Sequence, residues 1–346
     1  MNSKIEPLVR KNILKLHPYS CARDEFQGEA AAFLDANESP YNNPYNRYPD
    51  PLQHSLKKKI ARIKGVRPTQ IMIGNGSDEP IDLLIRIFCE PGEDNIVAIA
   101  PTYGMYKVCA DINNIEYKPV LLDENFNLNA ENLLSSTNSK TKMIFLCSPN
   151  NPSGNLLDFG EIRKIADQFQ GILVLDEAYI DFAPEASWLN VLEQYPKLVV
   201  LQTFSKAWGL ASIRCGMAFA SEEIIAYFNK IKYPYNINYL TQRFMEEQVD
   251  KTEEKENWVK RILEERIRIK PELEQIPIVE KVYLSDANFF LVKMTNAPLI
   301  YKKLAEQGIV VRSRHSIVLC DNCLRITVGT RKENELLLKA LNNLCE

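Results

Sequence analysis

The chain has 346 residues, 45% of them hydrophobic and 25% charged, with a formal net charge of −3 at pH 7. This is the composition of an ordinary globular protein, long enough for one large and one smaller domain with a sizeable core. The longest run of cations is Lys57-Lys-Lys59, which we expect on a solvated helix face. The near-neutral charge and the lack of a larger basic cluster argue against nucleic acid as the main partner.

The N-terminal sequence gives no sign of export or membrane insertion. Met1-Asn-Ser-Lys-Ile-Glu-Pro7 lacks the continuous apolar region of a signal peptide. No later stretch reaches the roughly 18 uninterrupted apolar residues of a membrane span. We therefore expect a cytoplasmic protein that does not bind membranes, with residues 1–35 as an N-terminal arm.

Strand-like apolar runs alternate with helical stretches from about residue 70 to residue 220, which is typical of parallel strands joined by crossover helices. The sequence predicts an α/β fold, in which a large domain over residues 36–245 holds a mostly parallel seven-stranded sheet with helices on both faces. Ligands of such sheets bind beyond the carboxyl ends of the strands. The expected strands lie near residues 71–73, 96–100, 116–122, 143–147, 172–176, 198–203 and 215–220.

The first of these strands leads into a glycine-containing turn. Gly74-Asn-Gly-Ser-Asp-Glu79 follows the strand and opens a helical stretch over residues 80–88. Free backbone N–H groups at a helix start, next to glycines that admit close approach, form an anion site. This turn is a candidate phosphate cup.

Three later strands end in residues that suit one coenzyme. Asn151 follows the run at 143–146, Asp176 ends the next run, and Lys206 follows the run at 198–201. Pyridoxal phosphate needs a lysine amine as covalent anchor and an acid opposite its pyridinium nitrogen, and a side-chain amide can bond its phenolic oxygen. Taken singly, such a lysine is most often a solvated loop residue and such an aspartate a helix cap. Their combination favours the coenzyme site.

The last hundred residues predict a separate, smaller α+β domain over residues 246–346. A charged, helix-favouring segment runs from Lys251 to Ile269. Strand-like runs and two further helices follow it. The expected strands lie near 282–284, 288–293, 309–311 and 324–328, and the helices near 298–307 and from residue 332.

Eight cysteines are scattered along the chain, several inside apolar runs where a reduced thiol packs, so no disulfide framework is expected. Cys320-Asp-Asn-Cys323 has the spacing of a metal or redox pair. No second pair accompanies it, and the three histidines form no companion motif. We predict a turn between strands there and no metal.

Several short motifs carry a family resemblance, since they occur in one family's order and at its spacing. The chain resembles the fold-type I pyridoxal phosphate aminotransferases, and within them it is similar to histidinol-phosphate aminotransferases over nearly its whole length. Many relatives have Ala-Gly where this chain has Ala211-Ser212, and we expect a small backbone adjustment there. The motifs are Tyr48-Pro-Asp-Pro51, Gly76-Ser-Asp-Glu79, Pro101-Thr-Tyr-Gly-Met-Tyr106, Ser148-Pro-Asn-Asn-Pro152, Asp176-Glu-Ala-Tyr179, Ser205-Lys-Ala207 and Leu324-Arg-Ile-Thr-Val-Gly-Thr-Arg331.

The resemblance assigns roles around the coenzyme. Lys206 is expected to anchor it and move protons, Asp176 to stay ionised beside the ring nitrogen, and Tyr179 with Asn151 to bond the phenolate oxygen. A homodimer is also implied, with one residue of each site donated by the partner subunit. In this scheme Tyr103 stacks on the ring, Ser77, Asp78, Ser205 and Arg214 hold the phosphate, and Tyr48 crosses from the partner.

Substrate choice is expected to depend on arginines in the last domain. Arg325 lies in a strand-like run, where an arginine flanked by apolar residues needs an anion or an acid, and Arg312 is its expected neighbour. The resemblance implies transamination between L-histidinol phosphate and 2-oxoglutarate, giving imidazole acetol phosphate and L-glutamate. The dianionic phosphate suits two arginines better than one. Tyr19 resembles the family's arm residue that closes over this anion.

Of three alternative functions, the sequence leaves the first two open and disfavours the third. An aromatic or broad-specificity aminotransferase would keep every coenzyme residue and differ only in the substrate pocket. A threonine-phosphate decarboxylase also binds a phosphate ester. A pyridoxal-phosphate-binding regulator would need a DNA-binding domain, for which the arm before residue 36 leaves no room.

Overall fold

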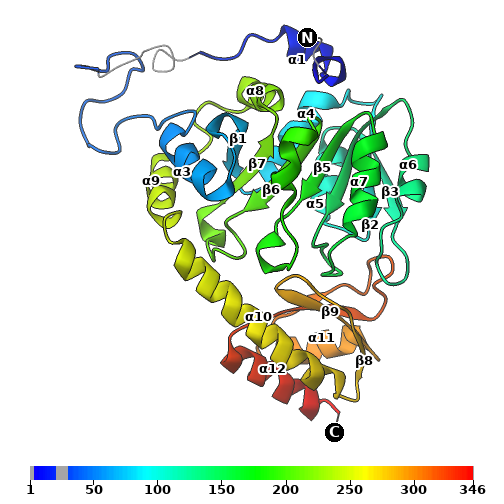
Figure 1. Ribbon diagram of the computed structural model, residues 1–346. Helices are drawn as coiled ribbons and strands as arrows, with labels where there is room; N and C mark the ends of the chain where they lie inside the picture. The colour runs from blue at the N-terminus through cyan, green and yellow to red at the C-terminus, as the bar shows by residue number, and fades with distance from the viewer. Residues whose placement is uncertain (1–3, 21–29, 346) are drawn as a thin grey trace.

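The structure is a computed structural model that describes residues 4–20 and 30–345. It contains a seven-stranded sheet of order β1-β7-β6-β5-β4-β2-β3 and a four-stranded sheet of order β10-β11-β9-β8. Figure 1 shows the larger sheet between helices and the smaller sheet near the C-terminus. Part of the predicted arm and Cys21 lie outside the described residues.

The seven-stranded sheet confirms the predicted mostly parallel α/β fold. Its central strands pair in parallel, while β7 runs antiparallel to both β1 and β6. Most of its strands are apolar along their whole length because helices cover both faces. The strands are β1 (Ile71–Asn75), β2 (Asn95–Ala100), β3 (Glu116–Leu121), β4 (Thr141–Cys147), β5 (Ile172–Asp176), β6 (Leu198–Thr203) and β7 (Cys215–Ala220).

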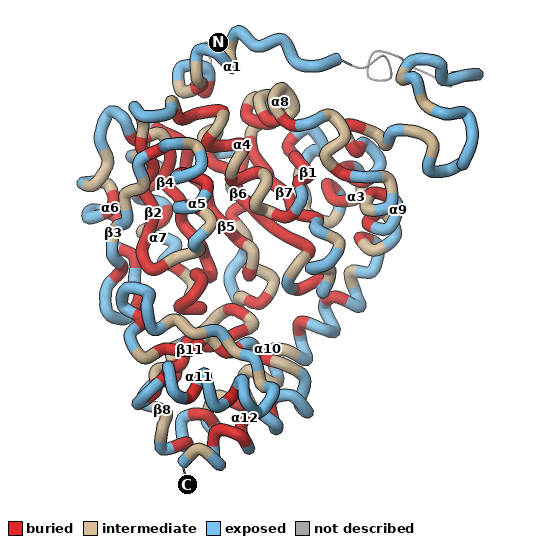
Figure 2. Tube along the Cα trace, turned by 180° about the vertical axis from the view of Figure 1, so that it is seen from behind, coloured by how far each residue is buried: buried red, intermediate tan, exposed pale blue. Residues whose placement is uncertain are grey.

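Alternate residues of each strand enter two different apolar cores. Ile144 and Leu146 of β4 belong to one core, whereas Met143 and Phe145 belong to the other. Figure 2 shows this burial concentrated along the sheet. The covering helices are α3 (His54–Lys64), α4 (Asp78–Phe88), α5 (Met105–Ile112), α6 (Ala130–Ser135), α7 (Phe159–Gln168), α8 (Glu222–Ile231) and α9 (Tyr239–Gln248), with α1 (Lys11–Lys15) in the arm and short 3₁₀ turns η1 (Glu6–Leu8), η2 (Pro68–Gln70), η3 (Ile180–Phe182), η4 (Trp188–Gln194) and η5 (Ala211–Ile213).

The C-terminal segment folds as the second sheet with helices. Its first strand begins earlier than predicted, because Val279 pairs with Met294 and Val282 with Val292. Residues 309–311 form no strand, and pairing starts at Arg312. The predicted boundary between residues 245 and 246 falls inside α9 and stays a prediction. The elements are α10 (Thr252–Glu274), β8 (Val279–Val282), β9 (Phe289–Met294), α11 (Ala297–Glu306), β10 (Arg312–Ser313), β11 (Cys323–Thr327) and α12 (Arg331–Asn343).

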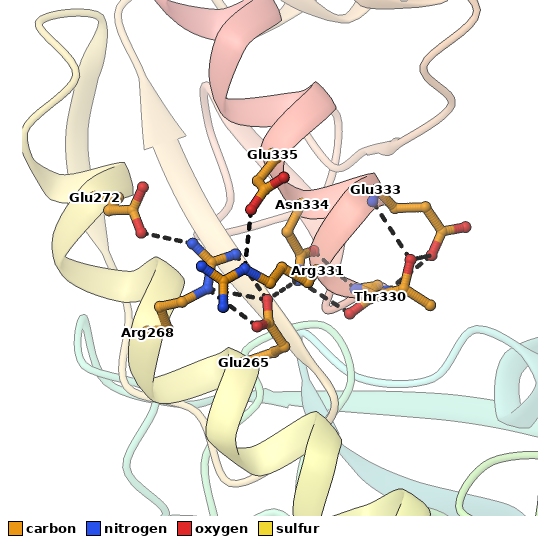
Figure 3. Close-up of polar contacts among 9 residues, drawn as sticks. Glu265, Arg268, Glu272, Thr330, Arg331, Glu333, Asn334 and Glu335 are labelled. Carbon is orange, nitrogen blue, oxygen red and sulfur yellow. Dashed lines mark hydrogen bonds and ion pairs between the residues drawn. The ribbon is translucent and has the colours of Figure 1, made fainter.

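A polar cluster fixes α12 to α10 (Figure 3). Arg268 Nη2 lies 2.7 Å from Glu265 Oε2, and Arg268 Nη1 lies 2.7 Å from Glu272 Oε1. Asn334 Nδ2 donates to Glu265 Oε2 at 2.9 Å across the two helices. Figure 1 shows α10 running from the large sheet to the small one. The contacts between α10 and α12 therefore attach the small domain to a helix that starts beside the large domain.

The cationic run Lys57–Lys59 does not lie wholly on a solvated face, as the sequence predicted. Lys57 is 6% exposed, and burial lowers the pKa of its ammonium group to about 8. Lys59 Nζ donates to the carbonyl of Glu246 at 2.6 Å. Lys59 thereby reaches α9, whereas Lys57 lines a cavity together with residues of α8. Among the residues that the structure describes, no helix is long and apolar enough to cross a membrane.

Candidate active site

A cavity of about 460 Å³ opens at the carboxyl ends of β4, β5 and β6, with residues of β10 and β11 on its other side. This volume lies in the range of small-molecule sites. The cavity gathers most of the residues predicted from sequence, from both sheets. These are Ser77, Asp78, Tyr103, Asn151, Asp176, Tyr179, Ser205, Lys206, Arg214, Arg312 and Arg325.

Lys206 lies in a tight loop after β6. Gly209 N–H donates to the carbonyl of Lys206 at 3.0 Å, which turns the chain back at once. Within residues 4–20 and 30–345, Lys206 Nζ has no hydrogen-bond or ion-pair partner, and it lies 5.6 Å from the ring centroid of Tyr179. Burial of the amine lowers its pKa, and the charge of Arg325 lowers it further. A larger neutral fraction makes the amine a better nucleophile and base.

Asp176 is the last residue of β5 and is only 2% exposed. Its Oδ2 accepts a hydrogen bond from Tyr106 Oη at 2.7 Å, and its Oδ1 accepts one from Ala178 N–H at 3.0 Å. Burial raises the pKa of this carboxyl, and the two hydrogen bonds oppose the shift. Tyr106 is fully buried and stacks on Phe145 at 4.8 Å. Sequence reasoning missed its contact with Asp176, since nothing in the motif indicates where the phenol points.

Tyr179 and Asn151 occupy neighbouring positions on the cavity wall. Tyr179 is buried and meets Phe289 edge-on, with ring centroids 5.1 Å apart. Burial raises the pKa of the Tyr179 phenol, and the charge of Arg325 opposes that shift. Asn151 Oδ1 accepts from Arg325 Nη1 at 2.6 Å, which leaves the amide N–H groups of Asn151 available as donors.

Two glycines allow a tight crossing at the predicted phosphate cup. Gly76 has φ +69°, and its N–H donates to the carbonyl of Arg214 at 2.9 Å. A Cβ on Gly76 would lie 2.5 Å from Arg214 Nη2, and one on Gly216 would lie 2.3 Å from the carbonyl carbon of Gly76. Arg214 itself has φ 56° and lies 3.5 Å from Asp78. Close backbone approach here therefore requires both glycines.

The start of α4 supplies free donors to the same cup. α4 begins at Asp78 with Ser77 as its N-cap. In the part of the chain that the structure describes, the N–H groups of Ser77 and Asp78 have no acceptor, as expected for the first turn of a helix. Tyr103 Oη donates to Asp78 Oδ1 at 3.0 Å, and Ser205 N–H donates to Thr203 Oγ1 at 3.1 Å. Backbone donors of this kind, with a guanidinium beside them, are what an anion binds at the start of a helix, as predicted from the sequence.

Three arginines converge on the opposite side of the cavity. Arg312 lies directly across from Arg325 in the antiparallel β10–β11 pair. The guanidinium carbon of Arg325 lies 5.3 Å from the ring centroid of Phe289. Arg314, which sequence reasoning missed, also lines the cavity. No carboxylate of the described residues lies within ion-pair distance of these three side chains.

Tyr48 and Tyr19 do not reach this cavity in their own chain. Tyr48 is 50% exposed and stacks on Tyr235 with ring centroids 4.4 Å apart, in a separate cavity. Tyr19 is 72% exposed and lines another cavity beside Arg86. Within a single chain in this conformation, neither tyrosine can take its predicted role. Those roles require a second subunit or a movement of the arm.

The Cys320–Cys323 pair forms a tight turn that leads into β11. Cys323 N–H donates to the carbonyl of Cys320 at 3.0 Å, and both thiols are free and buried. Burial raises the pKa of Cys320 to about 12 and that of Cys323 to about 11. Thiols held protonated in this way are poor nucleophiles and poor metal ligands. Among the residues described, no group of three potential ligands is placed to hold a metal ion.

The residue set fits pyridoxal 5′-phosphate. Lys206 offers an amine that has no hydrogen-bond or ion-pair partner among the described residues, and Asp176 offers a buried carboxyl group in the same cavity. The start of α4 with Arg214 offers donors for a phosphate, at a position where a side chain on Gly76 would collide with Arg214. Each requirement of the coenzyme is met by a different wall of one cavity.

Comparison with known proteins agrees with a pyridoxal phosphate site. The family model described as aminotransferase class I and II matches residues 22–341. The chain is similar to a histidinol-phosphate aminotransferase from Bacteroides thetaiotaomicron, with 58% identity over 338 residues that cover 97% of this chain and 98% of that protein. The crystal structure of the histidinol-phosphate aminotransferase from Clostridium acetobutylicum matches with a TM-score of 0.80 and 26% identity, over 87% of this chain and 91% of that chain.

An L-threonine-O-3-phosphate decarboxylase from Porphyromonas gingivalis shares the fold. Its structure matches with a TM-score of 0.74 and 21% identity, over 87% of this chain and 91% of that chain. At this identity the likeness concerns the fold alone, because one fold supports several reactions.

Proposed function

Because the chain belongs to the aminotransferase class I and II family, whose coenzyme is pyridoxal 5′-phosphate, we propose that it is the transaminase of L-histidinol phosphate. The amino group goes to 2-oxoglutarate, and the products are imidazole acetol phosphate and L-glutamate, in histidine biosynthesis. The observation that carries this proposal is that Arg312 and Arg325 both line the cavity of Lys206, and that neither forms an ion pair with a carboxylate of the described residues. Such a cluster suits a substrate anion.

The coenzyme would be held at both of its ends. Ser77 and Asp78 N–H groups, Ser205 and Arg214 would bind its phosphate, and Tyr103 would lie against its ring. When bound, the coenzyme supplies a carbonyl carbon for amine exchange and a protonated ring that withdraws electrons from the substrate carbon. The remaining chemistry belongs to side chains of this chain.

Lys206 moves the proton. With substrate and coenzyme bound, its amine would take the proton from the substrate carbon that bears the amino group and would then, as the ammonium, serve as the general acid. The lowered pKa of Lys206 supports this role, because a base must be unprotonated near the operating pH before it can act. Its position in the loop after β6, without a competing partner among the described residues, leaves the amine free to do so.

Asp176 would hold the protonated ring nitrogen of the bound coenzyme. Tyr106 Oη and Ala178 N–H both donate to its carboxylate, which stabilises the charged form inside an apolar wall. Tyr179 and Asn151 would donate to the phenolate oxygen of the bound coenzyme and help set its acidity. These contacts orient the ring before the substrate arrives, so little reorganisation is needed during the reaction.

Arg325 and Arg312 bind the anion of each substrate. Histidinol phosphate has no carboxylate and presents a phosphate ester, whereas glutamate presents carboxylates to the same side chains. The bond from Arg325 Nη1 to Asn151 Oδ1 ties the anion side of the cavity to the coenzyme side. A substrate anchored on Arg325 is thereby positioned against the reacting amine.

We further propose a cytoplasmic homodimer in which Tyr48 and the arm complete the site of the partner subunit. Tyr48 lies outside the cavity of its own chain. Several aromatic side chains around it are exposed, including Tyr41 at 79% and Tyr45 at 62%. Figure 2 shows the segment before α3 running exposed outside the large domain. Exposed aromatic clusters of this kind favour a subunit contact.

A half-reaction screen tests the proposed reaction. The coenzyme-loaded protein is mixed with single amines, and conversion to the pyridoxamine form is followed by absorbance. We expect fast conversion with L-histidinol phosphate and with L-glutamate, and little with unphosphorylated histidinol. Equal rates on histidinol and its phosphate, or faster turnover of phenylalanine or tyrosine, favour an aromatic aminotransferase. Release of carbon dioxide from threonine phosphate favours the decarboxylase.

A further inference from the structure

We propose that Arg314 is a third anion-binding residue of the substrate site, and that with Arg312 and Arg325 it selects a doubly charged anion over a singly charged one. The inference rests on the proposed function, because it names what distinguishes the phosphate ester from glutamate in one pocket. The sequence predicted Arg312 and Arg325 at this site but not Arg314.

The β10–β11 ladder places the three arginines on one face. Arg312 pairs with Arg325, and Arg314 N–H donates to the carbonyl of Cys323 at 2.9 Å, which continues the pairing by one step. Side chains two residues apart on an extended strand point to the same face, and so do residues directly opposite on paired strands. Arg312, Arg314 and Arg325 accordingly all line the cavity that contains Lys206.

The protein itself does not satisfy Arg314. Its Nε is buried and has no hydrogen-bond acceptor among the described residues. No carboxylate in that part of the chain forms an ion pair with it. Burial and the charges of Arg325 and Arg312 lower the pKa of Arg314 to about 10, which leaves it protonated at neutral pH. Like charges on facing positions destabilise a sheet, and an unsatisfied buried donor adds to that cost. A bound anion removes both penalties.

The position of Arg314 also suits an anion that reaches beyond the coenzyme cavity. A second cavity of about 390 Å³ adjoins the first. Tyr103, Asn151, Arg312 and Arg314 line both cavities and form their common wall. A tetrahedral dianion offers more acceptor oxygens than a planar carboxylate, so it can engage a third guanidinium that a carboxylate leaves unused.

Kinetics of the holoenzyme test the proposal with Arg314→Gln, Arg314→Lys and the matched control Arg331→Gln, which removes an exposed arginine on α12. For Arg314→Gln we expect kcat/KM to fall about 10–100-fold with L-histidinol phosphate and less than about threefold with L-glutamate. Arg314→Lys keeps the charge without the planar fork and is expected to recover part of the loss. Arg331→Gln should leave kcat/KM unchanged for both substrates.

Simple anions give a readout that does not depend on turnover of the phosphate substrate. Inorganic phosphate and acetate are each tested as competitors of L-glutamate in the half-reaction. Arg314→Gln should weaken inhibition by phosphate about tenfold or more, and inhibition by acetate little. If Arg314→Gln fails to fold, Arg314→Lys must still weaken phosphate more than acetate.

Two results separate the possible failures. If Arg314→Gln lowers kcat/KM equally for histidinol phosphate and glutamate, the role of Arg314 is overturned. The proposed function still stands in that case, provided that the parent enzyme prefers histidinol phosphate to histidinol. A parent enzyme that treats histidinol and histidinol phosphate alike overturns the proposed function itself.

Discussion

Replacing Tyr106 by phenylalanine removes one hydroxyl group and isolates a hydrogen bond that favours the charged form of Asp176. Tyr106 Oη donates to Asp176 Oδ2 at 2.7 Å, and both residues are closed to solvent. A hydrogen bond to a charged group contributes about 1.5–3 kcal/mol. Without that bond the charged form is less stable, so Tyr106→Phe should raise the pKa of Asp176 beyond the rise that burial already causes.

The effect on stability has a definite pH dependence. The pKa of Asp176 lies above its ordinary value in the folded protein, so this carboxyl favours folding fully only below its unfolded pKa. That contribution is lost as pH rises through the folded pKa. Because Tyr106→Phe raises the folded pKa of Asp176 further, the variant goes on losing folding free energy up to a higher pH than the parent does. The difference in stability between parent and variant therefore grows with pH. Above the folded pKa of the variant, the full cost of about 1.5–3 kcal/mol is reached.

Urea unfolding of the coenzyme-free protein between about pH 5 and about pH 8 measures this difference. Tyr117→Phe is the matched control, since Tyr117 is partly buried and no residue of the described chain bonds its hydroxyl group. Coenzyme affinity should also fall in Tyr106→Phe at neutral pH, because a more protonated Asp176 binds the ring nitrogen less well. A loss of stability that is the same at both ends of the pH range, or no larger than that of Tyr117→Phe, refutes the reasoning.

Five other substitutions test the site. Lys206→Ala should abolish turnover and covalent attachment while the protein stays folded, and borohydride reduction with peptide mapping must place the adduct of the parent on Lys206. Asp176→Asn should keep the attachment but slow proton abstraction by several orders of magnitude, since the lost charge acts on the transition state; an unchanged single-turnover rate at saturating coenzyme contradicts this. Arg312→Ala should lower kcat/KM about 10–100-fold for histidinol phosphate and less for glutamate, whereas Arg325→Ala should damage both half-reactions. Mixing Tyr48→Phe and Lys206→Ala chains under subunit exchange should partly rescue coenzyme affinity, and no rescue means that Tyr48 serves its own chain.

The large sheet and the residues at its strand ends were predictable because both depend on local patterns. Each strand is a short apolar run bounded by turn residues, and parallel strands bring their carboxyl ends to one edge. Asn151, Asp176 and Lys206 could therefore be expected in one place before any contact was known. The cavity lined by all three agrees with that expectation.

The contacts that depend on side-chain packing were not predictable. Tyr106 lies 70 residues before Asp176 in the chain, and only the packing of α5 against the sheet brings its hydroxyl group to the carboxylate. Lys57 was expected in solvent, yet it is buried where α3 packs. Arg314 was missed because the strand was predicted at residues 309–311, which left Arg314 in a loop, whereas pairing starts at Arg312.

The register of β10 against β11 explains how the protein tolerates three converging cations. Leu324 and Ile326 of β11 are buried in the core of the small domain, at 0% and 1% exposure, so the alternation of the strand turns Arg325 to the opposite face. Burying such side chains contributes about 1.5–3 kcal/mol each. A cross-strand pair of side chains typically contributes about 0.2–1 kcal/mol, and a pair of like charges is unfavourable. Burial therefore outweighs repulsion, and a slip of one residue, which would expose Leu324 and Ile326, is disfavoured. The same alternation that forms the apolar core thus keeps the arginines together in the absence of an anion.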